Sequence, residues 1–224
     1  MKDATFTDCL NDREEYGSGP GGAVSNHVKG SINFMGNLVM LDNEANDYFG
    51  DALGGSIYNR GDIVVDGDAE FVGSKGGSGG TIFQEQHATF TVYGFATFNE
   101  STCFDTTGGA IANIGGDMFF KGGSLFYDNF AENSGDGGYG GAIYNSFGAN
   151  IVMEGPTTFS NNHANWGGAI MNVETKNGRY ADDDVEELRV PTITFPDDTV
   201  FINNRAGFLC GDFAIGFDKD ICGP

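Results

Sequence analysis

The chain has 224 residues, which is enough for one large domain or two small ones, and 39% of them are hydrophobic, including 20 phenylalanines. Its 32 acidic and 11 basic residues give a formal net charge of −21, which excludes nucleic acid as a partner and suits cations or a basic partner. No apolar run approaches the ~18 residues of a membrane span, so membrane insertion is excluded as well.

Glycine accounts for 37 residues and falls into a recurring word, Gly-Gly followed by a small residue and usually a β-branched one. Copies of this word begin at Gly21, Gly54, Gly79, Gly108, Gly140 and Gly167. The spacing between the copies varies while the word stays the same. This is typical of a repeat that has a fixed core and variable loops.

A second marker follows each copy of the word. Apolar residues alternate with other residues up to a corner, and a large apolar residue comes four positions after that corner. These large residues are Met40, Phe71, Phe98, Phe126, Phe159 and Phe201. Three positions further on stand Asn43, Ser74, Ser101, Asn129, Asn162 and Asn204. The constant offsets predict two strands after the glycine word in every repeat.

Each repeat is therefore predicted to contain three short strands, which in the fifth repeat cover residues 141–144, 150–154 and 157–160. Equivalent strands recur only once per repeat, so they stack in parallel and one repeat forms one coil. The predicted fold is an all-β, right-handed parallel β-helix with about six full coils plus partial ends. The coils are expected within residues 1–206, starting near residues 21, 54, 79, 108, 140 and 167, with an insertion at 173–189 and a C-terminal capping tail at 207–224.

The repeated positions have expected roles inside the coil. The two glycines let the chain turn sharply and approach the neighbouring coil, and the isoleucine that follows points into the interior. The phenylalanines are expected to stack inside, one above another. The asparagines that close the glycine words are expected to hold a left-handed turn and to hydrogen-bond to their stacked copies. They are Asn26, Asn59, Asn113, Asn145 and Asn172, with Gln84 as the exception.

The words GGAI and F-x-x-N, the second in Phe126–Asn129, Phe159–Asn162 and Phe201–Asn204, resemble a known repeat. It is the repeat of the chlamydial polymorphic outer membrane proteins and of related β-helix proteins of algae and other microbes, within the pectin-lyase-like superfamily. The likeness covers residues 6–206. It implies a secreted or surface β-helical protein, often one implicated in adhesion. The resemblance thus places the chain outside the cytosol, secreted, on the cell surface or in an organelle lumen, after a targeting sequence has been removed.

The expected function is that of a non-catalytic structural or interaction protein. It would be an adhesin-like rod, or an accessory subunit that docks in a larger assembly through a flat β-face and its loops. The outward column of the first strand contains Tyr58, Phe83, Tyr144 and Met171, and it is predicted to form the interaction face as an exposed apolar stripe. The other interpretation of this column, that loops cover it, stays open.

Polysaccharide-active enzymes share the right-handed β-helix, so a carbohydrate-active or carbohydrate-binding protein is the alternative function. Of the elements of a polygalacturonase-type site only the paired aspartates are present, and the basic residues do not recur on one coil face as a lyase requires. No cofactor is expected. Asp182, Asp183 and Asp184 in the acidic insertion are candidate ligands of a hard cation, although a solvated acidic loop is the simpler interpretation.

The four cysteines provide a geometric test. Cys9 and Cys103 are expected to lie in register three coils apart, about 14 Å along the axis, which is too far for a disulfide. Cys210 and Cys222 flank a short segment and are predicted to pair.

Two further features concern the surface and the ends of the rod. Asn99 begins a glycosylation sequon on an outward position. The first recognisable strand, around Phe6, corresponds to the third strand of a coil. The N-terminal end is therefore expected to be uncapped, and to be covered by further residues, a second copy or a partner subunit.

Overall fold

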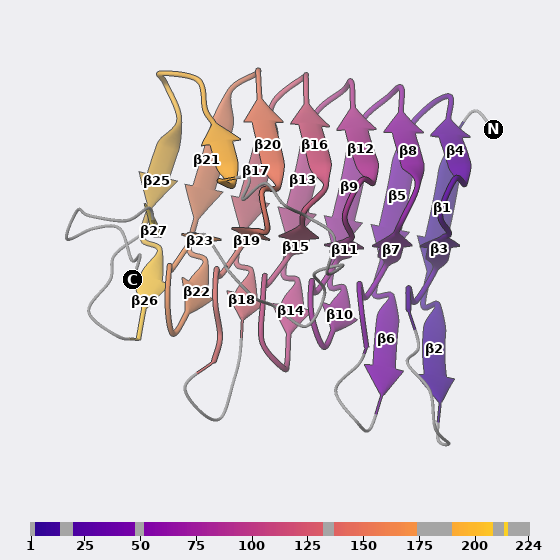
Figure 1. Ribbon diagram of the computed structural model, residues 1–224, viewed down its shortest axis with the longest axis horizontal. Helices are drawn as coiled ribbons and strands as arrows, with labels where there is room; N and C mark the ends of the chain where they lie inside the picture. The colour runs from indigo at the N-terminus through magenta and orange to yellow at the C-terminus, as the bar shows by residue number, and fades with distance from the viewer. Residues whose placement is uncertain are drawn as a thin grey trace.

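The computed structural model describes residues 3–13, 20–47, 52–131, 137–173, 190–207 and 213–214, and in these residues every regular element is a β-strand. The described part of the chain thus contains no helix that is long and apolar enough to cross a membrane. The strands belong to four sheets, named A to D here, which run side by side along the long axis of the molecule (Figure 1).

Sheet A has seven strands, the first of which carries Phe6 opposite Met40 and the other six of which carry the large apolar residues that follow a corner. They are β1 (Ala4–Thr7), β5 (Leu38–Leu41), β9 (Ala69–Val72), β13 (Ala96–Asn99), β17 (Ser124–Tyr127), β21 (Thr157–Ser160) and β25 (Val200–Ile202).

Sheet B follows sheet A in every coil, and five of its seven strands are only two residues long. They are β2 (Leu10–Arg13), β6 (Glu44–Asp47), β10 (Lys75–Gly76), β14 (Thr102–Cys103), β18 (Phe130–Ala131), β22 (His163–Ala164) and β26 (Arg205–Ala206).

Sheet C begins at the glycine words, and sheet D leads from it back to sheet A. Sheet C consists of β3 (Val24–Asn26), β7 (Ile57–Asn59), β11 (Ile82–Gln84), β15 (Ile111–Ile114), β19 (Ile143–Ser146), β23 (Ile170–Val173) and β27 (Phe213–Ala214). Sheet D consists of β4 (Ser31–Phe34), β8 (Asp62–Val65), β12 (Thr89–Val92), β16 (Asp117–Phe120), β20 (Asn150–Met153) and β24 (Thr192–Thr194).

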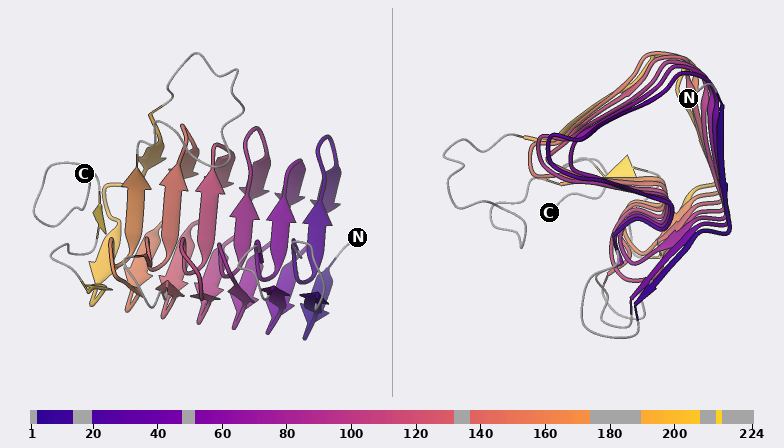
Figure 2. Two further views of the ribbon diagram at one scale, coloured as in Figure 1. Left: turned by 60° about the horizontal axis from the view of Figure 1, so that its bottom comes forward. Right: turned by 90° about the vertical axis from the view of Figure 1, so that its right-hand side faces the viewer.

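All the strand pairs are parallel, and equivalent residues of successive repeats are direct partners, as in Phe98 opposite Phe126. The predicted all-β parallel β-helix is therefore confirmed, and the view along the axis shows the coils superposed (Figure 2, right). The prediction of three strands per coil missed sheet B. Its inward column consists of small residues such as Cys103, Ala131 and Ala164, so it lacks the alternation of large apolar residues by which strands are recognised.

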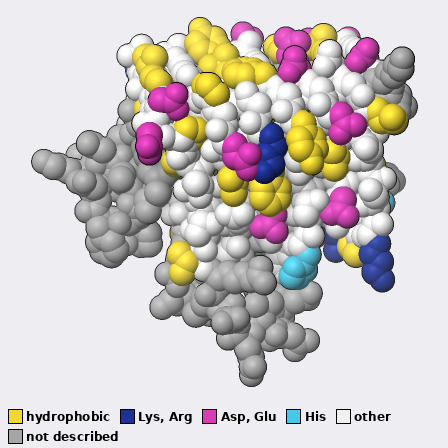
Figure 3. Space-filling view, turned by 90° about the horizontal axis from the view of Figure 1, so that it is seen from above, with side chains coloured by type: hydrophobic (Ala, Val, Ile, Leu, Met, Phe, Trp, Pro, Cys, Tyr) yellow, Lys and Arg dark blue, Asp and Glu magenta, His cyan; other side chains and the backbone are white. Residues whose placement is uncertain are grey.

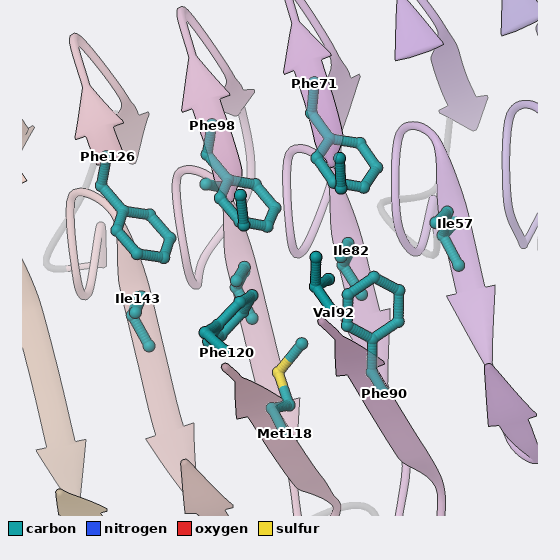
Figure 4. Packing of buried hydrophobic residues seen from close by; sticks show 14 of the residues in the cluster. Ile57, Phe71, Ile82, Phe90, Val92, Phe98, Met118, Phe120, Phe126 and Ile143 are labelled. Carbon is teal, nitrogen blue, oxygen red and sulfur yellow. The ribbon is translucent and has the colours of Figure 1, made fainter. Parts of the chain in front are cut away.

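The interior is filled by columns of stacked apolar side chains. The phenylalanines of sheet A stack face to face, with ring centroids 4.8 Å apart between Phe98 and Phe126 and 4.7 Å apart between Phe126 and Phe159. Phe120 of sheet D meets Phe126 edge-on at 6.1 Å. The isoleucines of sheet C, including Ile143, close the third side of this core (Figure 4). The predicted stacking and the inward isoleucines are both confirmed.

The paired glycines are required at different points of the same turn. Gly108 has a φ of +68°, in the left-handed region that other residues avoid. A Cβ atom on Gly109 would lie 1.9 Å from the backbone oxygen of Gly141 in the next coil. The first glycine therefore permits the turn and the second permits the close approach of two coils, as the sequence predicts.

The asparagines of sheet C form hydrogen-bonded ladders, but they do not hold the left-handed turn expected of them. Asn145 donates from Nδ2 to Oδ1 of Asn172 at 2.9 Å. Six of the nine non-glycine residues with positive φ lie instead just before the F-x-x-N position, for example Asp128 and Asn161. This part of the prediction was wrong because both columns contain asparagine and only the backbone distinguishes them.

The F-x-x-N asparagines connect neighbouring coils. Oδ1 of Asn162 accepts hydrogen bonds from the backbone nitrogen of Asn129 and from its Nδ2, at 3.1 and 2.9 Å. Nδ2 of Asn162 in turn donates to the backbone oxygen of Phe126 at 3.0 Å. One buried amide thus satisfies backbone groups at a corner that has no regular strand pairing, which explains why the word recurs.

Candidate interaction surface

The interaction face predicted on sheet C lies beneath other parts of the chain. The side chains of Tyr58, Phe83, Tyr144 and Met171 do point away from the main core, but the structure buries Tyr58, Phe83 and Met171 and half-buries Tyr144. The exposed apolar stripe is therefore contradicted, and the alternative interpretation of this column is correct.

The cover consists largely of residues that precede the glycine words. Leu53 packs against the cluster that contains Tyr58 and Phe83, and Tyr139 and Trp166 pack against Met171. These residues lie in the variable stretches between repeats, so the repeat pattern gave no sign of them. Burial also raises the pKa of the Tyr144 hydroxyl above its ordinary value.

The outer side of sheet A carries exposed and half-buried apolar residues instead. Two positions of each strand point outward there, and register stacks them into two columns along the axis. The first column is Thr5, Val39, Glu70, Thr97, Leu125, Thr158 and Val200. The second column is Thr7, Leu41, Val72, Asn99, Tyr127, Ser160 and Ile202. These two columns are called the sheet A face.

The sheet A face is apolar in four of its seven strands and carries one charged residue, Glu70. Tyr127 is 37% exposed, and Val200 and Ile202 are 42% and 45% exposed. Its remaining positions are mostly threonine, serine and asparagine. A surface this poor in charge, on a chain of which 19% is charged, is typical of a protein contact.

More exposed apolar side chains border the sheet A face at the turns that lead into it from sheet D. Tyr93 is 56% exposed and Phe95 is 41% exposed. The Phe95 ring lies against the backbone of Gly123, where a Cβ atom would come within 3.1 Å of the ring. Figure 3 looks onto this corner and shows hydrophobic and acidic side chains with few basic ones among them.

Acidic residues flank the sheet A face at both ends of its strands. At the turns from sheet D they are Asp3, Asp66, Asp68, Glu154, Asp197 and Asp198. At the turns into sheet B they are Asp8, Asp42, Glu100 and Asp128. Among the described residues of these turns the one basic side chain is Lys121, which pairs with Glu154 and lies 5.3 Å from the centroid of the Phe119 ring. The flanks therefore have a strong excess of negative charge.

Asn99, the predicted glycosylation site, lies on the sheet A face, where its Nδ2 donates to Glu100 at 3.4 Å. The sequon's Ser101 is buried, and its hydroxyl bonds to that of Thr81 at 2.6 Å. Whether Asn99 carries a glycan remains a prediction.

The prediction that Cys9 and Cys103 do not pair was right in its outcome and wrong in its register. Cys9 and Cys103 are both free. However, Cys9 stands in the column of Asn43, and the backbone nitrogen of Cys9 donates to Asn43 Oδ1 at 3.0 Å. Cys103 stands two positions further along the coil, in the sheet B column of Gly76. Cys9 thus replaces an F-x-x-N asparagine.

Two predicted features lie outside the described residues. They are the candidate cation ligands Asp182, Asp183 and Asp184, and the predicted disulfide between Cys210 and Cys222. Within the described ranges no group of three or more His, Cys, Asp and Glu side chains is placed to hold a metal ion.

A comparison with protein families supports the resemblance of the repeat. A model of the Chlamydia polymorphic membrane protein repeat matches residues 156–173, which contain Phe159, Asn162 and the glycine word at Gly167. No curated protein and no solved structure matches the chain.

Proposed function

We propose that this protein is a non-catalytic β-solenoid that binds another macromolecule through the sheet A face and the adjoining turns from sheet D. The observation that carries the proposal is the exposed apolar surface of sheet A, in which Glu70 is the one charged outward residue. The rigid stack of parallel strands holds these side chains in fixed columns, so little conformational entropy is lost when a partner binds.

The similarity of one repeat to the Chlamydia polymorphic membrane protein repeat supports an adhesin-like role and a location outside the cytosol. A protein that acts on a surface or as a subunit of a larger assembly needs an extended and rigid contact area. Columns of side chains along a solenoid supply such an area.

Carbohydrate binding is the second candidate. Its support is the exposure of three aromatic rings, those of Tyr93 and Phe95 at the turn from sheet D and that of Tyr127 at the opposite end of the neighbouring strand. Aromatic faces can stack on the apolar faces of sugar rings, and the acidic residues nearby can accept hydrogen bonds from sugar hydroxyls.

Site-specific photo-crosslinking in an extract of the native source tests the proposal. A photo-reactive amino acid replaces Tyr127 on the sheet A face in one protein and Val152, a half-buried outward residue of sheet D, in another. We expect a discrete macromolecular adduct from position 127 and none from position 152. Equal labelling at the two positions would contradict a specific sheet A contact. An adduct that glycosidase digestion removes would favour the carbohydrate alternative.

A further inference from the structure

We infer that the partner of the sheet A face is an amphipathic α-helix with an apolar stripe between two rows of lysine or arginine, lying along the solenoid axis. This inference rests on the proposed function and names the chemistry of the partner. It depends on three properties of the described residues: the dimensions of the face, the spacing of its apolar side chains and the charge at its two borders.

The dimensions of the sheet A face match those of one helix. Its strands are mostly four residues long, so the face is about 13 Å wide. Seven strands at a spacing of ~4.8 Å place β1 and β25 about 29 Å apart. A helix is ~10–12 Å across with its side chains, and about 20 residues of helix span 30 Å. One helix therefore covers the face along its whole length.

The apolar residues of the face are spaced for helical contacts. Val39 and Leu41, Leu125 and Tyr127, and Val200 and Ile202 lie on the second, fifth and seventh strands of the sheet. At ~4.8 Å per strand the three pairs are about 14 Å and about 10 Å apart along the axis, which correspond to about 10 and about 7 residues of a helix, so one apolar stripe of a helix can reach all three. The small hydroxyl side chains of Thr158 and Ser160 lie between the apolar pairs and leave room for larger partner residues.

The charges on the two borders call for basic residues on both sides of the helix. Asp8, Asp42, Glu100 and Asp128 lie along one border in backbone conformations with φ between 51° and 53°, and the column is neutral at Gly73, Asn161 and Asn203. Like charges stacked at the ~4.8 Å spacing of the strands repel one another, and a row of partner cations relieves this repulsion. The opposite border carries Asp66 and Asp68.

The 224 residues of this sequence do not themselves supply such a helix. The chain has 11 basic residues scattered among 32 acidic ones, and it contains no segment with a basic row on each side of an apolar stripe. A second copy brings its own net charge of −21 to the contact, which opposes self-association through this face.

Binding of a synthetic peptide to the full chain tests the inference. The peptide has 21 residues, about the length of the face, with leucine at heptad positions a and d, lysine at e and g, and glutamine elsewhere. A rearranged peptide of the same composition spreads the leucines around the helix, and a third peptide has glutamate in place of lysine. We expect the amphipathic peptide to bind with a Kd about tenfold or more below that of the rearranged peptide, with a gain of helical circular dichroism, and the glutamate peptide not to bind.

Protein variants locate the peptide. Leu125→Asp is expected to raise the Kd about tenfold, whereas the matched change Val152→Asp on sheet D leaves it within about twofold. The pair Asp42→Asn and Asp128→Asn is expected to weaken binding and to flatten its salt dependence, because asparagine tolerates the positive φ while removing the charge. Asp117→Asn on sheet D serves as its control, and far-ultraviolet circular dichroism verifies that each variant is folded.

Several outcomes would overturn the inference. Equal affinity for the amphipathic and the rearranged peptides would mean that the acidic protein attracts any polycation. Equal effects of Leu125→Asp and Val152→Asp on the Kd would place the peptide outside the sheet A face. Sedimentation showing that Leu125→Asp abolishes a dimer identifies the face as a contact between copies. If a macromolecule crosslinks at position 127 but the peptide does not bind, the proposed function is retained and only the inference of a helical partner is rejected.

Discussion

Gln84 reaches past Asn113, its partner in the next coil, and leaves the Oδ1 atom of Asn113 buried without a hydrogen bond. Its Nε2 atom instead donates to the backbone oxygens of Ala88 and Asp117, at 3.2 and 2.9 Å. The asparagine ladder of sheet C is therefore interrupted at this one step, because the longer side chain carries the Gln84 amide past Asn113 Oδ1, whereas at the next step Asn113 Nδ2 donates to Asn145 Oδ1 at 3.0 Å.

Replacing Gln84 by asparagine is expected to restore the ladder. Nδ2 of the new side chain can donate to Asn113 Oδ1, which raises the free energy of unfolding by about 1 kcal/mol. The reverse change, Asn145→Gln, is expected to lower it by about 1–3 kcal/mol because it leaves an amide unsatisfied in another coil. Guanidinium unfolding of the two variants measures both effects. A loss of stability in Gln84→Asn would mean that the contacts with Ala88 and Asp117 contribute more than the ladder.

The phenylalanine stack predicts a large effect at its centre. Phe126 is fully buried between Phe98 and Phe159, so Phe126→Ala is expected to lower the free energy of unfolding by about 3–5 kcal/mol. The matched control is Phe95→Ala, where the ring is exposed and the expected change is below about 1 kcal/mol. Denaturant unfolding followed by circular dichroism compares the two. Similar losses would show that the columns do not dominate the core.

Much of this fold was predictable because each repeated word is required by one local property of the backbone or its packing. Gly108 and Gly109 are required by backbone conformation and by close approach, so the word that contains them marks the turn in every repeat. Part of what was not predicted depends on segments outside the words. The burial of Tyr58 by the stretch that contains Leu53 is such a case. The sheet A face was not predicted either, because its columns are recognised only when the outward residues of all the strands are aligned in register.

The second glycine of each word offers a test of close packing. In Gly109→Ala the new methyl group has no space, because the oxygen of Gly141 would be 1.9 Å away and neither backbone can move without breaking the stack. We expect a loss of at least about 3 kcal/mol, or failure to fold. Gly207→Ala is the control, since the nearest atom to its Cβ would be a side-chain oxygen at 3.1 Å. A folded Gly109→Ala protein with unchanged stability would contradict the observed approach of the coils.

Thr81 and Ser101 should behave as an energetically coupled pair. Their hydroxyl groups form a buried hydrogen bond of 2.6 Å, whereas the next coil has Ala110 and Asn129 at the equivalent positions. Thr81→Ala alone leaves the Ser101 hydroxyl without this bond, and Ser101→Asn alone crowds Thr81. The double variant reproduces the arrangement of the next coil, so a double-mutant cycle is expected to give a favourable coupling of about 1–2 kcal/mol. Additive losses would show that the two positions are independent.

The cysteines should differ sharply in reactivity. Burial raises the pKa of the Cys103 thiol to about 11, and its Sγ lies 2.9 Å from the backbone oxygen of Gly77, so it stays neutral and shielded at pH 8. Cys9 is half-exposed and is expected to react with iodoacetamide under native, non-reducing conditions, while Cys103 remains unlabelled.

The same thiol makes stability depend on pH in the alkaline range. Because the folded protein holds the Cys103 proton more tightly than the unfolded chain, its contribution is complete below the ordinary pKa near 9.0 and is lost as the pH rises towards about 11. Cys103→Ala, which introduces the residue found in the next coil at Ala131, is expected to flatten this loss.

Peptide mapping of the labelled protein also tests Cys210 and Cys222, which the predicted disulfide protects until a reductant is added. Rapid native labelling of Cys103 would contradict its place inside sheet B.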